Sequence, residues 1–250
     1  MKVLVIDVGG TNLKVSLGGP KPPLKIPSGR ALDAGKMARD VLAATAGWDY
    51  EAVSIGYPGP VAQGRPAEDP KNLAPGWVPF DYDAAFARPV RVINDAAMQA
   101  LGSYEGGHML FLGLGTGLGS ALVYDGVLAP LELAHMPYRK GRTYEDYLGL
   151  RGYKRLGRKK WQRYFEEALG HLVMALKPDD VVLGGGNAKK LTPLPAGTRL
   201  GHNSLAFLGG FRLWDPKAEL QPTPIGDKST LQRSDGDLLP LKPQAPVARK

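Results

Sequence analysis

The sequence predicts an α/β fold in which two half-domains of similar construction flank a central cleft. An apolar strand, a glycine turn and a second apolar strand occur in this order twice, near residue 9 and near residue 115. After the first hairpin, apolar residues at helical spacing lead into another short apolar strand. We interpret the recurrence as an internal repeat in which each half-domain carries its own phosphate-facing hairpin.

The first third of the chain contains the elements that suggest the fold. The β-branched and apolar residues 3–7 predict a buried strand, and Met37, Val41 and Leu42 stand at helical spacing. The expected elements are strands at 3–7, 13–17 and 24–26, a helix at 31–46, strands at 52–55 and 90–93, and a helix at 96–104. Three antiparallel strands, a helix and a strand form the opening of a ribonuclease-H-like half-domain.

The rest of the chain extends this pattern. The expected elements are strands at 109–114 and 120–124, helices at 144–150 and 159–176, a strand at 180–183 and a helix at 204–213. Residues 56–80 are rich in Pro and Gly without a period, which is typical of a long functional loop. We expect ribonuclease-H-like lobes at 1–106 and 107–215, and a Pro- and Lys-rich tail at 216–250 that is poorly ordered.

The composition excludes several classes of site. The chain has 250 residues, 43% of them hydrophobic, which allows one large or two smaller domains with a sizeable core. Cysteine is absent, which excludes disulfides, thiolate zinc sites and a cysteine nucleophile. No apolar run approaches the roughly 20 residues of a membrane span. The first residues lack the features of a signal peptide, so we expect a cytoplasmic protein without membrane contact.

Two glycine turns are candidates for binding phosphates. In the first, Gly9, Gly10, Thr11 and Asn12 can bring backbone N–H groups close to an anion, and Asp7 at the strand end can hold Mg²⁺ directly or through water. In the second, a run of glycines joins two apolar strands; its candidate residues are Gly115, Thr116 and Gly117. Plain hairpin turns are the alternative for both segments.

Three further segments are candidates for substrate contacts. Asp95 follows a strand and can accept the proton of an attacking hydroxyl, while Asn94 can bond a sugar hydroxyl; a helix N-cap is the alternative. Glu132 and His135 are three residues apart, so their side chains can lie on the same face of the chain and contact neighbouring sugar hydroxyls; ordinary surface residues are the alternative. A nucleotide base or ribose can approach the glycines that follow the strand at 180–183, which include Gly184 and Gly185.

The order of these segments resembles the ROK family of repressors, open reading frames and sugar kinases, within the hexokinase, actin and Hsp70 superfold. The resemblance covers roughly residues 1–214, and within the family the sequence is most similar to the polyphosphate glucokinases. It implies a two-lobed sugar kinase with Asp95 as catalytic base and a homodimer as the assembly. The glucose contacts it implies are Asn72, Asn94, Glu132, His135 and Glu145.

The sequence also departs from the family pattern. The usual Glu-Leu-Gly-His reads Glu-Leu-Ala-His here, so Ala134 would be strained if its position required a positive φ. Residues 139–144 replace the zinc-binding cysteine cluster of many members, so we expect no zinc. The segment 184–202 is short, so the pocket for the adenosine part of ATP is expected to be incomplete.

The phosphoryl donor stays open between ATP and polyphosphate, with Mg²⁺ as cofactor. The net charge is +8, which favours anionic partners. Seven basic residues suit a long polyanion but also fit an ordinary solvated helix face; they are Arg151, Lys154, Arg155, Arg158, Lys159, Lys160 and Arg163. Nucleic-acid binding is a third reading of these residues, but no helix-turn-helix segment precedes the first strand, which argues against a transcription factor, so a nucleic-acid partner is not expected.

The expected activity is transfer of a phosphoryl group to a hexose hydroxyl, and the first candidate acceptor is the 6-hydroxyl of glucose. Two alternatives remain. One is a non-catalytic sugar sensor on the same fold, and the other is a kinase for mannose or an N-acetylated hexosamine. The sequence does not rank these sugars, because one axial hydroxyl is recognised by three-dimensional geometry.

Overall fold

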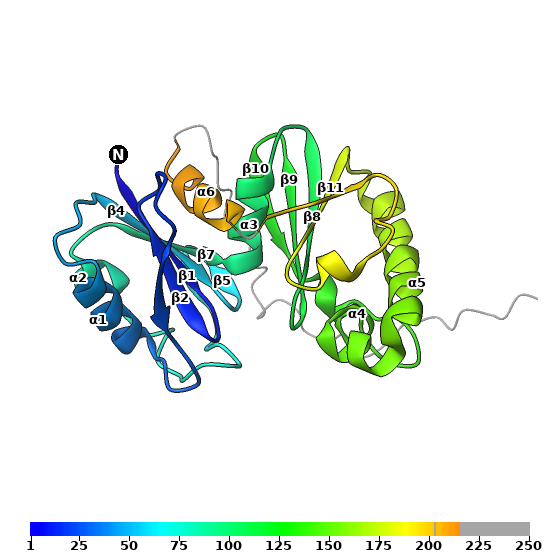
Figure 1. The fold of residues 1–250 in the computed structure, drawn as a ribbon, viewed down its shortest axis with the longest axis horizontal. Coiled ribbons are helices and arrows are strands. Elements are labelled where there is room, and N and C mark those ends of the chain that lie inside the picture. Colours follow the sequence, from blue (N-terminus) through cyan, green and yellow to red (C-terminus); the bar gives the residue numbers. More distant parts are fainter. Residues whose placement is uncertain (203, 216–250) are drawn as a thin grey trace, which may run out of the picture.

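The protein is described by a computed structural model that covers residues 1–202 and 204–215. Two β-sheets lie side by side, and helices separate them and cover their outer faces (Figure 1). The tail that the sequence predicts at 216–250 lies outside the described residues.

The first sheet has the strand order β3-β2-β1-β4-β7. Its first three strands are antiparallel neighbours, and β4 and β7 then run parallel to β1. The bounds are β1 Val3–Val8, β2 Asn12–Ser16, β3 Leu24–Pro27, β4 Ala52–Tyr57 and β7 Val90–Asn94. Because β1, β4 and β7 run in one direction, Asp7, Tyr57 and Asn94 lie at the same edge of the sheet.

The second sheet repeats this arrangement with the order β10-β9-β8-β11-β12. Three antiparallel strands are again followed by two parallel ones. The bounds are β8 His108–Leu114, β9 Leu118–Tyr124, β10 Val127–Leu131, β11 Asp180–Gly184 and β12 Thr198–Leu200. The internal repeat is confirmed, and it is more complete than the sequence indicated, since β10 and β12 were not foreseen.

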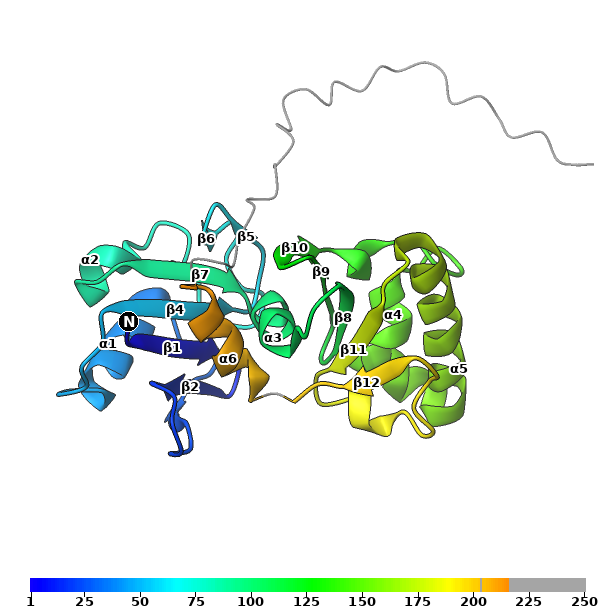
Figure 2. The ribbon, with the colours of Figure 1, turned by 90° about the horizontal axis from the view of Figure 1, so that it is seen from above.

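Helices cover the outer faces of both sheets and fill the space between them (Figure 2). The helices α1 and α2 pack on the first sheet, and α4 and α5 pack on the second. The remaining helices, α3 and α6, lie between the sheets. The bounds are α1 Ala34–Ala44, α2 Tyr82–Phe86, α3 Asp95–Ser103, α4 Tyr144–Leu148, α5 Leu150–Leu176 and α6 Leu205–Arg212. Among the described residues, no helix is both long and apolar enough to cross a membrane.

A single hydrophobic cluster joins the two sheets through α3 and α6. It contains Val5 of the first sheet, Phe111 of the second and Met98 of α3, and all three side chains are fully buried. The two middle helices touch backbone to backbone, because Cβ atoms placed on Gly102 and Gly209 would lie 1.7 Å and 1.8 Å from carbonyl oxygens of the opposite helix. The lobes therefore share a tightly packed central layer.

Three elements differ from the sequence prediction. The loop at 56–80 contains a short hairpin, whose strands are β5 Val61–Ala62 and β6 Arg65–Pro66. The helix expected at 159–176 is present, and a further helical segment that starts at Leu150 precedes it; the two parts of α5 meet at a kink at Gly157, whose φ of 70° and ψ of 163° are not helical. The first helix starts later than expected, at Ala34, because the Asp33 side chain accepts a hydrogen bond from the Lys36 N–H and caps it.

Candidate active site

The N-terminus of α3 places Asp95 at the edge where β1, β4 and β7 end. Asn94 is the N-cap, and its side-chain oxygen accepts hydrogen bonds from the amides of Ala96 and Ala97 at 3.0 Å and 3.1 Å. The cap that the sequence offered as an alternative role for Asp95 therefore belongs to Asn94. Asp95 is the first residue of the helix, and its carboxylate accepts one hydrogen bond, from the Ala96 amide at 2.7 Å, through Oδ1.

Asp95 lies in an environment that weakens its acidity. Burial, opposed by a hydrogen bond from the Ala96 amide and reinforced by the negative charge of Asp7, raises the pKa of Asp95 to about 6. The Lys14 ammonium acts in the other direction on the same carboxyl group. A carboxylate with a pKa near 6 is a stronger base than an ordinary aspartate, and it is still ionised at neutral pH.

The first glycine turn lies beside this carboxylate. Gly9 closes the turn, because its N–H donates to the Asn12 carbonyl at 3.2 Å and a Cβ there would lie 2.8 Å from that oxygen. The tip of the turn, formed by Gly10 and Thr11, is exposed. Its amides are thus accessible to an anion, as the sequence predicts for a phosphate-binding loop.

Lys14 is a residue of this site that the sequence analysis did not single out. It pairs with Asp7 across the antiparallel strands β1 and β2. Its Nζ atom lies 2.8 Å from Asp7 Oδ2, and the Asp7 side chain is only 17% exposed. A signal was present in the sequence, because the alternation of β2 places Lys14 two residues after Asn12 on the same face of the strand.

The second glycine hairpin packs directly against the start of α3. A Cβ placed on Gly119 of β9 would lie 2.6 Å from the Cβ of Ala96. Only a residue without a side chain allows this approach. The contact brings β9 of the second hairpin next to Asp95, while Asp7, which precedes the first glycine turn, acts on the same carboxyl group through its charge.

The glycines after β11 support the second hairpin from behind. Gly185 has a φ of 80°, and a Cβ there would lie 2.4 Å from the Leu114 carbonyl oxygen. Asn187, which the sequence analysis missed, donates from its side chain to the Gly115 carbonyl at 2.7 Å. Gly184 is the last residue of β11 itself, and a Cβ there would meet the Phe111 side chain at 2.4 Å. Gly185 and Asn187 therefore hold the second glycine turn in place, whereas Gly184 packs on the sheet.

Glu132 and His135 lie beside the same hairpin. Glu132 is the N-cap of the short 3₁₀ helix η1 (Leu133–His135) and His135 is its last residue; the Glu132 carboxylate lies 3.6 Å from His135 Nε2, and both side chains are about two-thirds exposed. Ser120 of β9 ties the segment to the sheet, because its hydroxyl donates to the Leu131 carbonyl at 2.8 Å and accepts from the Leu133 amide at 3.2 Å. The two side chains lie close together, as their spacing suggested, and their contact with a sugar stays a prediction.

The alanine in this segment is accommodated without strain. Ala134 lies within η1, is only 4% exposed, and is not among the described residues with positive φ. The replacement of the usual glycine therefore leaves the local backbone intact in this chain.

Glu145 and Asn72 have different surroundings. The Glu145 carboxylate contacts the second hairpin, where it accepts a long hydrogen bond of 3.4 Å from the Leu118 amide, and a Cβ on Gly117 would lie 2.3 Å from its Oε2. Asn72 is exposed in the loop before Trp77, and no contact to another predicted site residue is described for it. Asn94 contacts the same long loop that contains Asn72, because its side chain donates to the Gly59 carbonyl at 3.1 Å.

The described residues contain no group of three or more His, Asp or Glu side chains that could hold a metal ion. Asp7 is a single carboxylate, already bonded to Lys14. Such a site suits Mg²⁺ only in the way that phosphoryl-transfer enzymes use it, with one or two protein carboxylates and the remaining ligands from water and substrate phosphates.

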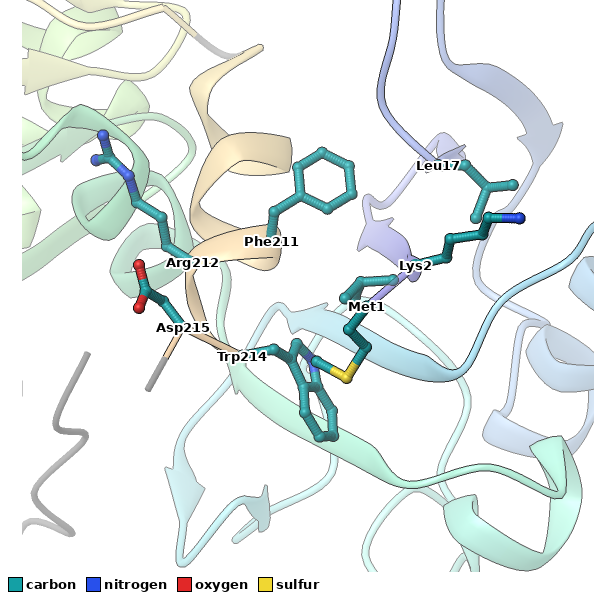
Figure 3. A pocket seen from close by; sticks show the side chains of 8 residues that line it. Met1, Lys2, Leu17, Phe211, Arg212, Trp214 and Asp215 are labelled. Atoms are coloured by element: carbon teal, nitrogen blue, oxygen red, sulfur yellow. The ribbon is translucent and has the colours of Figure 1, made fainter. Parts of the chain in front are cut away.

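The described cavities lie away from these residues. One of about 510 Å³ is lined by Met1, Leu17, Phe211 and Trp214, where α6 meets the first strand (Figure 3). A second of about 400 Å³ lies at the other end of α3, near Tyr104. Neither is lined by Asp95.

The fold is shared with solved sugar kinases. A polyphosphate/ATP-glucomannokinase from Arthrobacter sp. strain KM matches with a TM-score of 0.70 and 24% identity, over 84% of this chain and 96% of that chain. A ROK family glucokinase from Streptomyces griseus, solved with glucose and AMPPNP, matches with a TM-score of 0.68 and 17% identity, over 85% of this chain and 99% of that one.

Two curated proteins match part of the sequence. An N-acetylmannosamine kinase from Vibrio vulnificus is 32% identical over 145 residues, which is 50% of this chain and 48% of the relative. A glucokinase from Pyrobaculum calidifontis is 31% identical over 137 residues, which is 51% of this chain and 45% of the relative. The chain thus spans about half the length of the curated relatives it matches, and no family model matches it. With its two repeated sheets and the helix layer between them, the chain has the fold of the ROK family sugar kinases.

Proposed function

We propose that this protein is a sugar kinase that transfers a phosphoryl group to a hydroxyl of a hexose, with glucose as the first candidate. One observation supports the proposal above the others. The carboxylate of Asp95, with its raised pKa, lies at a helix N-terminus on which the second glycine hairpin packs, and it is close enough to Asp7, before the first glycine turn, to respond to its charge. The matches to a glucokinase and to a polyphosphate/ATP-glucomannokinase agree with this reading.

In the proposed reaction, Asp95 accepts the proton of the attacking hydroxyl. The hydroxyl oxygen forms a bond to the terminal phosphorus of the donor as the bond from that phosphorus to the bridging oxygen breaks. The electron pair leaves with the bridging oxygen, and the proton stays on the Asp95 carboxylate until product release. The atoms and charges of the reaction therefore balance without a further reactant.

The donor phosphates lie, in this proposal, against the exposed turn at Gly10 and Thr11 and against the hairpin at Gly115–Gly117. Lys14 offers a positive charge beside Asp7 and Asp95, where charge on the transferred group has to be offset. Asp7 would hold Mg²⁺, through water, and the ion would supply further charge neutralisation for the phosphates.

The hexose lies, in this proposal, near Glu132, His135 and Glu145, which all contact or adjoin the second hairpin. Asn94 has one side-chain N–H left after its bonds to the α3 amides and to Gly59. The match to an N-acetylmannosamine kinase makes an N-acetylated hexosamine the second candidate substrate. A cytoplasmic location and a homodimer remain predictions.

A direct assay tests the proposal. Glucose, mannose and N-acetylmannosamine are each incubated with the protein, Mg²⁺ and either ATP or long-chain polyphosphate, and sugar phosphate is measured. Turnover of glucose with either donor is the expected result. A protein that glucose stabilises against heat but that turns over no sugar with either donor would instead be a sugar sensor.

The pH dependence of the rate gives a separate prediction. Because the pKa of Asp95 is about 6, the base is protonated at lower pH. We expect kcat/KM for the sugar to fall about tenfold per pH unit below 6 and to level off above it. The measurement is a pH–rate profile between pH 4.5 and pH 8; an acidic limb centred near 4 would mean that the base is an ordinary exposed carboxylate.

A further inference from the structure

The segment 136–144 forms a small closed loop on the second lobe. Pro137 and Thr143 form an antiparallel bridge, and beside it the Tyr144 amide donates to the Met136 carbonyl at 3.0 Å. The two ends of this 136–144 loop are therefore held together by its own backbone hydrogen bonding.

The loop connects two residues that the proposed function assigns to the hexose. His135 is the last residue of η1 and directly precedes the loop, and Glu145 directly follows it in the first turn of α4. The hydrogen bond between Tyr144 and Met136 joins the immediate neighbours of these two residues. A displacement of the loop would therefore displace His135 and Glu145 together.

Tyr138 packs the loop against the helices of the second lobe. Its ring lies edge-on to Tyr144 and Tyr147 of α4, with 5.1 Å and 5.0 Å between ring centres, and to Tyr164 of α5 at 6.2 Å. Tyr144 and Tyr147 belong to the buried core of this lobe, and Tyr138 is half-buried against it. Because edge-to-face packing is directional, these rings favour one orientation of the loop.

Arg139 adds a second contact between the loop and α5. Its guanidinium lies 5.5 Å from the ring centres of both Tyr138 and Tyr164, and its Nη2 atom lies 2.6 Å from Oε1 of Glu167. The hydrogen bond from Arg139 holds the pKa of the Glu167 carboxyl below its usual range, so the ion pair is present at neutral pH. A planar guanidinium can lie over a ring and bond a carboxylate at the same time, which a lysine ammonium does less well.

This ion pair is better suited to fixing the loop than to stabilising the whole fold. The side chains of Arg139 and Glu167 are 49% and 32% exposed, and ion pairs with this much exposure add little to the free energy of unfolding. They do, however, join a surface loop to a long helix. Loss of the pair should therefore change the position and mobility of the loop more than the stability of the protein.

From these contacts we propose that Tyr138, Arg139 and Glu167, here called the loop anchor, position His135 and Glu145 for binding the hexose. The anchor residues are positioning residues, which act by fixing the 136–144 loop without contacting the sugar themselves. The identity of the ligand rests on the proposed function. The attachment of the loop to α5 does not, because it follows from the contacts of the anchor alone.

The test compares two variants of the full chain that each lose one ion pair. Arg139→Met removes the pair with Glu167 and keeps an unbranched side chain beside the two rings. The matched control is Lys36→Met in α1, which breaks the pair with Asp40, whose atoms are also 2.6 Å apart and whose side chains are 47% and 28% exposed. We expect the KM for glucose to rise about 5- to 20-fold in Arg139→Met, with kcat and the donor KM within about twofold of wild type. The control should match wild type in all three.

Hydrogen exchange measured by mass spectrometry without substrates tests the anchor separately from catalysis. We expect faster amide exchange over residues 133–145 in Arg139→Met and unchanged exchange there in Lys36→Met. Unchanged exchange in both variants would overturn the anchor, whatever the kinetics show.

The kinetic outcomes separate this inference from the proposed function. Turnover of glucose with a KM that is equal in Arg139→Met and the control would overturn the positioning role and keep the kinase. A lower kcat at an unchanged glucose KM would also overturn it, because the loop would then act on the transfer step. If wild type turns over no sugar with any donor, the kinase fails; a glucose affinity, measured by titration, that falls only in Arg139→Met would still support the positioning role.

Discussion

Asp95→Asn is expected to lower the rate of phosphoryl transfer by about 10²- to 10⁴-fold while sugar affinity stays near that of the wild type. The amide has nearly the shape of the carboxylate and can still accept the hydrogen bond that the Ala96 amide donates at 2.7 Å. It cannot accept the proton of the attacking hydroxyl. Steady-state kinetics with saturating donor, together with a sugar-binding titration, measure the two quantities separately.

The same variant should be more stable than the wild type at neutral pH. The folded-state pKa of Asp95 is raised to about 6, so the stability that its proton provides is complete at low pH and is lost as the pH rises from about 4 to about 6. The neutral amide avoids this loss, and we expect a gain of about 1–3 kcal/mol in unfolding free energy at pH 7.

Asp81→Asn serves as the control, because Asp81 caps α2 by accepting a hydrogen bond from the Ala84 amide, and asparagine caps equally well. This control should change neither rate nor stability. Near-normal turnover in Asp95→Asn would remove Asp95 from the role of base.

The second large effect is expected from Gly209→Ala. A Cβ at this position would lie 1.8 Å from the Met98 carbonyl oxygen, and a backbone atom of α3 cannot move aside as a flexible side chain can. The helices α3 and α6 would have to separate, which we expect to cost about 2–4 kcal/mol in unfolding free energy. Thermal unfolding, followed by circular dichroism or calorimetry, measures this loss.

Gly170→Ala in α5 is the matched control for this substitution. Gly170 is also helical and exposed, but nothing lies within 4 Å of a Cβ placed on it. Alanine there should be neutral or stabilise the protein by about 0.5–1 kcal/mol, because alanine favours helix. If both variants unfolded at the wild-type temperature, the contact between α3 and α6 would be looser than the geometry indicates.

Much of the fold could be predicted from the sequence, because its signals are local. The glycine turns at 9–12 and 115–117 stand between apolar strands, and each turn is visible without knowledge of any distant contact. Their recurrence predicted two similar sheets, which the structure confirms. The position of Asp95 at a strand end was equally local, since parallel strands bring such ends to one edge of a sheet.

Other features depend on residues far apart in the chain. The close approach of Gly102 to α6 cannot be seen in the sequence, because the residues it meets follow about 100 positions later. The ion pair between Asp7 and Lys14 depends on the register of β1 against β2. The helical segment between Leu150 and the kink at Gly157 was missed because glycines inside a polar segment are common helix ends.

The shared layer of α3 and α6 also determines how the two lobes can move. Because both sheets pack on α3, this helix lies at the pivot of any rotation of one lobe against the other. Points near a pivot are displaced least, so Asp95 at the start of α3 would keep nearly the same position during such a rotation. The second hairpin, which packs on Ala96 through Gly119, would stay close to it, whereas elements farther from α3 would be displaced more. As the proposed base, Asp95 would then be a fixed reference against which the lobes align the two substrates.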